Sequence, residues 1–124
     1  MIIECYQLLK EIEKRPAMWT GEVNLKSIKI FVSGYYLALI NHKIVPENIN
    51  EPFFDWIANK LGYFESTAGW VNMILAYSVG FEPESIIWEE LFDCNVTKEQ
   101  HLKSIQLFYE LVEQFKTEFE TNSN

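Results

Sequence analysis

The sequence is poor in the residues from which catalytic and cofactor sites are usually built. Its two histidines, His42 and His101, have no nucleophile-and-base signature around them, and nucleophilic catalysis needs a side chain beside an oriented base. Its five glycines are scattered, so it contains neither a phosphate-binding P-loop nor a dinucleotide-binding fingerprint. Metal-site spacings such as CxxC and HExxH are missing. We therefore expect no enzyme, no cofactor and no metal.

Cysteine and long apolar runs are also scarce. Cys5 and Cys94 lie far apart in the sequence, which is typical of two buried free thiols in a reducing cytosol. No apolar run approaches the roughly 20 residues that span a bilayer, and Met1-Ile2-Ile3 is followed at once by Glu4 instead of a signal-peptide core. We expect a cytoplasmic protein with no membrane partner.

Basic residues are outnumbered, with one arginine among ten Lys and Arg against eighteen Asp and Glu. The imbalance lies in one half of the chain. Residues 1–60 hold seven basic and seven acidic side chains, and residues 61–124 hold three and eleven, so the second half carries the whole net charge of −8. An acidic surface repels nucleic acid and attracts basic proteins. The alternative is that the charge only maintains solubility.

Two-residue alternation of apolar and polar residues, the mark of strands, is absent, whereas helical spacing recurs throughout. We predict an all-α protein, a single compact bundle of about six helices. The length of 124 residues fits one domain, residues 1–120, followed by a frayed polar tail, residues 121–124.

The helix boundaries follow from capping residues, prolines and glycines. Helices are expected at about 2–14, 25–42, 51–61, 68–79, 83–93 and 98–120, with an irregular stretch from Pro16 to Asn24. The expected N-caps are Asn24, Asn50, either Ser66 or Thr67, and the capping-box segment Thr97-Lys98-Glu99-Gln100.

The helix expected at 25–42 is apolar on nearly all sides, which is typical of a buried central helix. Gly34 within it lowers helix propensity by about 1 kcal/mol against alanine. We interpret this glycine as permitting the close approach of a neighbouring helix.

An acidic segment, Glu82 to Asp93, has five carboxylates in twelve residues, interleaved with aromatic side chains. Carboxylates around an aromatic anchor suit the binding of a basic protein surface. The predicted partner-binding residues are Glu82, Glu84, Trp88, Glu89, Glu90 and Asp93. The alternative is an amphipathic helix with Trp88 and Phe92 in the core and its acids in water.

The segment Arg15-Pro16-Ala17-Met18-Trp19, followed by Ser27-Ile28, Phe31 and Gly34-Tyr35, resembles a pattern of small helical bacterial proteins. In these proteins a loop with the sequence RPxMY precedes a helix that contains Ser-Ile, Phe and Gly-Tyr. In the present sequence Trp19 stands at the position of the loop tyrosine. The resemblance covers roughly residues 10–75. Such proteins belong to toxin–immunity loci, including contact-dependent inhibition systems. The resemblance implies an immunity protein that neutralises one cognate toxin domain, often a nuclease.

For the loop itself we expect a structural role. Pro16 ends the first helix, Met18 and Trp19 tuck under the next one, and Arg15 bonds helix-end carbonyls or a carboxylate. The motif residues are Arg15, Pro16, Met18, Trp19, Gly34 and Tyr35.

Two other classes stay open. One is a helical interaction or regulatory module, for instance an obligate homodimer, although we favour a monomer. The other is an enzyme with a site assembled from scattered residues such as Tyr35, His42 and Glu65.

Overall fold

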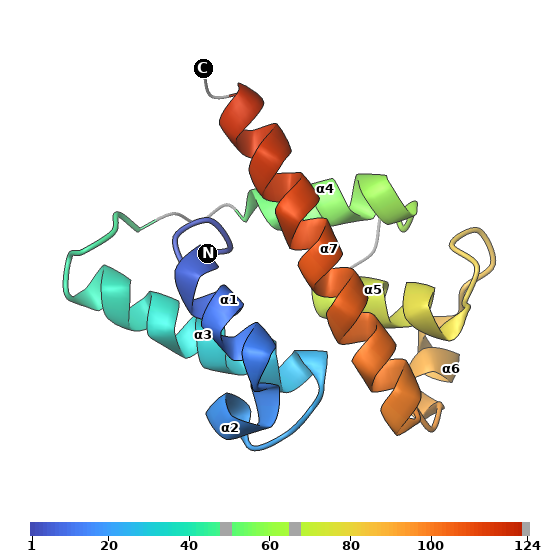
Figure 1. Cartoon of the computed structure of the whole chain (residues 1–124). Helices are drawn as coiled ribbons and strands as arrows, with labels where there is room; N and C mark the ends of the chain where they lie inside the picture. The colour runs from blue at the N-terminus through green and yellow to red at the C-terminus, as the bar shows by residue number, and fades with distance from the viewer. Residues whose placement is uncertain (48–50, 65–67, 123–124) are drawn as a thin grey trace. The chain divides into compact units, whose positions relative to one another are not determined.

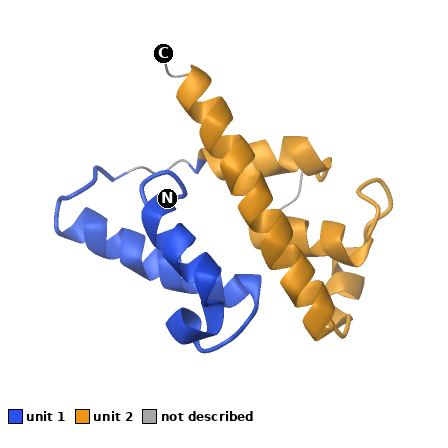
Figure 2. Cartoon of the chain, viewed as in Figure 1, with its two compact units in different colours: residues 1–51 blue, residues 52–124 orange. Residues whose placement is uncertain are grey.

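The computed structural model describes residues 1–47, 51–64 and 68–122. Within these ranges the chain forms seven helices and no strand, which confirms the predicted all-α class (Figure 1). By its internal contacts the chain divides into two compact units, residues 1–51 and residues 52–124 (Figure 2). The prediction of one domain over residues 1–120 stays a prediction.

The first unit contains α1 (Tyr6–Lys14), α2 (Pro16–Thr20) and α3 (Leu25–Asn41). The stretch after Pro16, expected to be irregular, is instead a short helix, and it is the extra element beyond the six predicted. Pro16 occupies the first turn of α2, where a missing backbone N–H costs nothing, and Gly21 ends the helix with φ of 81°. Residues 2–5 form turns, so α1 begins later than predicted.

The start of α3 is capped as the sequence predicts. The Asn24 side chain accepts a hydrogen bond from the Ser27 N–H at 2.8 Å. Glu22 supports this cap, since its carboxylate accepts bonds from the Asn24 amide at 3.0 Å and the Ser27 hydroxyl at 2.6 Å. These two hydrogen bonds lower the pKa of Glu22.

The prediction that this helix is buried on all sides is wrong. Its buried residues, Leu25, Ile28 and Val32, lie on one side. Ile30, Tyr35 and Leu37 are exposed, Ile30 by 59%. The close approach expected at Gly34 is also wrong, because a Cβ built there meets no atom within 4 Å.

The second unit contains α4 (Pro52–Leu61), α5 (Trp70–Val79), α6 (Trp88–Asp93) and α7 (Lys98–Asn122). The long helix α7 contacts both α4 and α5 (Figure 1). Its capping box is confirmed: the Gln100 N–H donates to the Thr97 hydroxyl at 3.1 Å, and the Thr97 N–H donates to the Gln100 side chain at 2.9 Å.

An aromatic cluster fills the centre of this unit. Phe53 of α4 is fully buried and lies 5.2 Å, centroid to centroid, from both Trp70 of α5 and Phe115 of α7. Trp70 stacks on Phe108 of α7 at 5.2 Å. Because aromatic pairs bury a large apolar area and prefer such edge-on and offset geometries, this cluster fixes α4, α5 and α7 on one another.

Two predicted boundaries in this unit differ from the structure. The helix expected from Pro83 begins only at Trp88, because residues 83–87 form turns and extended backbone. Helix α7 continues through Thr121 and Asn122, the first two residues of the predicted tail. The predicted caps Asn50, Ser66 and Thr67, together with tail residues 123–124, lie outside the described residues.

Candidate functional site

The six predicted partner-binding residues lie in one segment of the second unit, partly in a loop and partly on a helix. Gly80, with φ of 103°, ends α5 in the left-handed conformation. A turn follows, in which the Ser85 N–H donates to the Glu82 carbonyl at 3.2 Å. Glu82 and Glu84 therefore belong to the loop, and the other four residues belong to α6 (Figure 1).

Tyr63, just after α4, anchors both parts of this segment. The side chain is only 2% exposed, its hydroxyl donates to the Phe81 carbonyl at 2.6 Å, and its ring lies 5.5 Å from the Trp88 ring. The preceding residue, Gly62, lies beside Pro83, and a Cβ built on it would make an ordinary contact with the proline ring at 3.6 Å. Burial, then the Glu82 and Tyr77 groups, raises the pKa of Tyr63 to about 12.

Tyr63 is not among the functional residues predicted from the sequence. A tyrosine directly after a helix-ending glycine is a weak local signal, and its partners at Phe81 and Trp88 are distant in the sequence.

All five carboxylates of the segment are exposed. Among the described residues none of them forms an ion pair or a hydrogen bond. Elsewhere the acids Glu4, Glu11, Glu13 and Glu120 are each paired with a cation of the chain. The five carboxylates of the segment therefore have no counter-ion among the described residues.

Apolar side chains stand exposed among these carboxylates. Phe92 is 58% exposed and Ile87 is 52% exposed, whereas Leu91 is buried and ties α6 to the unit. Trp88 is half-buried; its ring is tilted against Tyr63 and stacked with Phe92. The alternative in which Trp88 and Phe92 both fill the core is thus wrong for Phe92. We call this surface the α6 patch: Glu82, Glu84, Ile87, Trp88, Glu89, Glu90, Phe92 and Asp93.

The motif residues of the resemblance lie in the first unit, and they differ from one another in burial and contacts. Trp19 is half-buried and meets Phe31 of α3 edge-on at 6.0 Å. Met18 does not tuck under that helix, since it is 68% exposed. The backbone N–H of Arg15 donates to the Ile12 carbonyl at 3.1 Å, and Pro16 opens α2. Gly34 and Tyr35 lie on an exposed side of α3.

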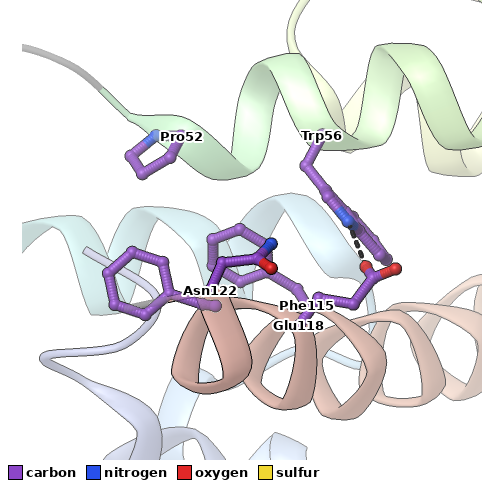
Figure 3. Close-up of a pocket in the computed structure, with 6 residues that line it drawn as sticks. Pro52, Trp56, Phe115, Glu118 and Asn122 are labelled. Atoms are coloured by element: carbon purple, nitrogen blue, oxygen red, sulfur yellow. Dashed lines mark hydrogen bonds between the residues drawn. The ribbon is translucent and has the colours of Figure 1, made fainter. Parts of the chain in front are cut away.

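A second feature of the second unit was not predicted: an open groove of about 420 Å³ between the start of α4 and the end of α7 (Figure 3). It is lined by Pro52, Trp56, Phe115, Glu118, Phe119 and Asn122. The Trp56 indole N–H donates to the Glu118 carboxylate at 2.5 Å, across the groove from helix to helix (Figure 3). Apart from this carboxylate and the Asn122 amide the lining is apolar, made by three aromatic side chains and Pro52.

Other side chains of chemical interest are dispersed. Tyr35 lies on α3 and His42 forms its C-cap, and Glu65, the third residue of the scattered enzyme site, lies outside the described residues. Both cysteines are free thiols, but Cys94 is half-buried, not buried as expected. Burial raises the pKa of Cys5 to about 11, which keeps this thiol protonated.

Within the described part of the chain, no cluster of three or more His, Cys, Asp or Glu is placed to hold a metal ion. In the same residues every helix is too short or too polar to cross a membrane. No protein-family model, curated protein or solved structure matches this chain.

Proposed function

We propose that this protein binds a basic surface of a partner protein through the α6 patch. The observation that carries the proposal is the exposure of Phe92 and Ile87 among five unpaired carboxylates. Exposed apolar groups of this size supply buried area on association, and aromatic residues dominate binding energy at interfaces. The carboxylates raise the rate of encounter with a cationic partner and select against anionic ones.

The α6 patch is held ready for binding by contacts inside the second unit. Tyr63 fixes the loop through its bond to Phe81 and supports Trp88 through its ring. A surface that is already ordered loses less conformational entropy when a partner binds.

The partner that we propose is a cognate bacterial toxin domain, and the protein acts as its immunity protein. This rests on the resemblance of the Arg15–Trp19 loop and the following helix, together with the acidic charge. A nuclease toxin holds nucleic acid phosphates in a basic groove, and an acidic inhibitor is complementary to such a groove or its rim. Neutralisation would take place in the cytoplasm, by a monomer, without catalysis or a cofactor.

A growth-rescue experiment tests this function. The protein is co-expressed with the toxin domain encoded immediately upstream, under otherwise lethal induction, and the two are then co-purified. Survival with a stable complex supports the proposal. Death of cells that contain soluble, folded protein contradicts the immunity role.

A charge-reversal pair tests the surface. Glu84→Lys with Asp93→Lys changes the patch without placing lysine in the first turn of α6, where a positive charge opposes the helix dipole. The matched control, Glu47→Lys with Glu110→Lys, makes the same change in net charge at exposed sites outside the patch. We expect the patch pair to lower the association rate by about tenfold or more at low salt, and the control to lower it far less. Equal effects of the two pairs would contradict the patch assignment.

A homodimeric interaction module is the second candidate, and the exposed Ile30 and Leu37 on α3 favour it. Self-association through the α6 patch is disfavoured, since a two-fold contact would bring like charges together. Light scattering on the purified protein separates a dimer from the proposed monomer.

A further inference from the structure

The groove between α4 and α7 has the chemistry of a site for a cation that carries an apolar stem. Trp56, Phe115 and Phe119 supply aromatic walls, and Glu118 supplies one negative charge at the rim (Figure 3). Aromatic faces attract cations through the ring quadrupole, and a carboxylate adds a charge-assisted hydrogen bond. The volume of about 420 Å³ lies within the range of sites that hold small ligands or single side chains.

The Glu118 carboxylate is positioned before any ligand arrives. Its bond from the Trp56 indole N–H fixes the side chain across the groove. A carboxylate has about four acceptor positions, so Glu118 can still accept two more hydrogen bonds from a ligand. A fixed acceptor beside an aromatic wall reduces the entropy lost on binding.

Charged side chains close to the groove act in both directions. The last turn of α7 contains no basic residue. Lys116, next to Phe115 in the sequence, is paired with Glu120 at 2.7 Å. The Lys60 ammonium lies 5.7 Å from the centre of the Trp56 ring, so a cation can approach this indole, but the lysine charge opposes a second cation there.

We propose that this groove binds an arginine side chain presented by a partner protein. Arginine suits it better than lysine, because the planar guanidinium is weakly hydrated, stacks on aromatic faces and donates a pair of parallel bonds to one carboxylate. The aliphatic stem lies against Phe119 and Pro52, and the guanidinium meets Glu118 beside Trp56. The site is separate from the α6 patch and does not depend on the proposed function.

The separation from the patch follows from helix geometry. Glu118 and Phe119 lie on the last turns of α7, whereas α6 precedes the first turn. A rise of 1.5 Å per residue places Glu118 about 30 Å along the helix from its start. A partner contacting the groove therefore meets a different part of the second unit.

The test uses blocked arginine, N-acetyl-arginine-methylamide, titrated into the full chain labelled with nitrogen-15. The Trp56 indole N–H signal, assigned by its disappearance in Trp56→Phe, reports binding at the site. N-acetyl-citrulline-methylamide is the matched probe, with nearly the same shape and no charge. We expect saturable shifts with a dissociation constant on the order of 1 mM for blocked arginine and at least tenfold weaker binding of the citrulline probe. Absence of a saturable shift, or equal binding of the two probes, overturns the proposal.

Variants test the named groups. Glu118→Gln removes the charge but keeps an oxygen that accepts the Trp56 bond, and we expect it to weaken blocked arginine about tenfold. Glu110→Gln is the control on an exposed position of the same helix and should leave binding unchanged. Equal losses in the two variants mean that general charge, not this carboxylate, is responsible. Phe119→Ala should weaken both probes, because it removes an apolar wall.

One further probe identifies the source of the guanidinium. Free arginine carries a carboxylate and an ammonium that a side chain within a protein lacks. Tighter binding of free than of blocked arginine would point to a metabolite site and overturn the assignment to a partner protein. Equal or weaker binding of free arginine supports it.

Discussion

Tyr63 provides the sharpest test of how the α6 patch is held. Tyr63→Phe keeps the ring that contacts Trp88 and deletes only the hydroxyl that donates to the Phe81 carbonyl. A typical intramolecular hydrogen bond contributes about 1 kcal/mol net, and a carbonyl left unpaired away from water costs about 1–3 kcal/mol. Because Phe81 is only half-buried, water reaches part of this site. We therefore expect the free energy of unfolding to fall by about 1 kcal/mol.

The pH dependence makes the test specific to the hydroxyl. Burial raises the pKa of Tyr63 from 10.0 to about 12, so the native state favours the neutral phenol. The resulting stability is fully present below pH 10 and is lost as pH rises through about 12. The phenylalanine variant has no such group. The stability advantage of the natural protein should therefore be constant up to pH 10 and shrink between pH 10 and 12.

The assay is urea denaturation followed by circular dichroism, with both proteins measured side by side at neutral pH and through this alkaline range. Comparison with the variant cancels the titration of the other tyrosines and the lysines. Equal stability at neutral pH would refute the role given to the hydroxyl bond. An advantage that stays constant to pH 12 would refute the assignment of the raised pKa to this site.

Substitutions at four further positions probe local structure, each by denaturant unfolding. Thr97→Ala removes the capping box of α7 and should cost about 1 kcal/mol, whereas Thr97→Ser should be nearly neutral; equal losses would contradict the cap. Gly34→Ala should stabilise α3 by about 0.5–1 kcal/mol, because the helix gains propensity and the Cβ meets open space, and a loss would show an unseen close contact. Gly80→Ala should instead destabilise by about 1 kcal/mol, since φ is 103° there. Phe53→Ala, at the centre of the aromatic cluster, should cost about 3–5 kcal/mol, and a cost below 1 would contradict its central place.

Features that depend on neighbours in the sequence were predictable. The all-α class follows from apolar spacing. The caps at Asn24 and Thr97 follow from side chains that accept a hydrogen bond from the backbone N–H three residues later. Gly62 and Gly80 end their helices with positive φ, as their positions after the apolar stripes indicate. In each case the partner atoms lie within one helical turn, so no knowledge of tertiary contacts was needed.

Proline was only partly informative. Pro16 correctly marks the end of α1, but the same residue opens α2, where an irregular stretch was predicted. A proline stops the helix before it and fits the first turn of a helix after it, so its presence alone does not distinguish a loop from a short new helix.

The sequence by itself determined that this protein is helical, where most helices begin and end, and that its acidic side chains gather in residues 61–124. Only the tertiary structure decided which apolar faces are covered. Apolar spacing shows that α3 is apolar on two sides and that α6 carries Leu91 and Phe92. It does not show that Ile30 of α3 and Phe92 of α6 stay exposed. The groove is also decided by the tertiary structure. Trp56 and Glu118 meet only because α4 and α7 pack on each other through Phe53 and Phe115. Burial and pocket formation depend on contacts between distant segments, and local spacing carries no information about which of those contacts form.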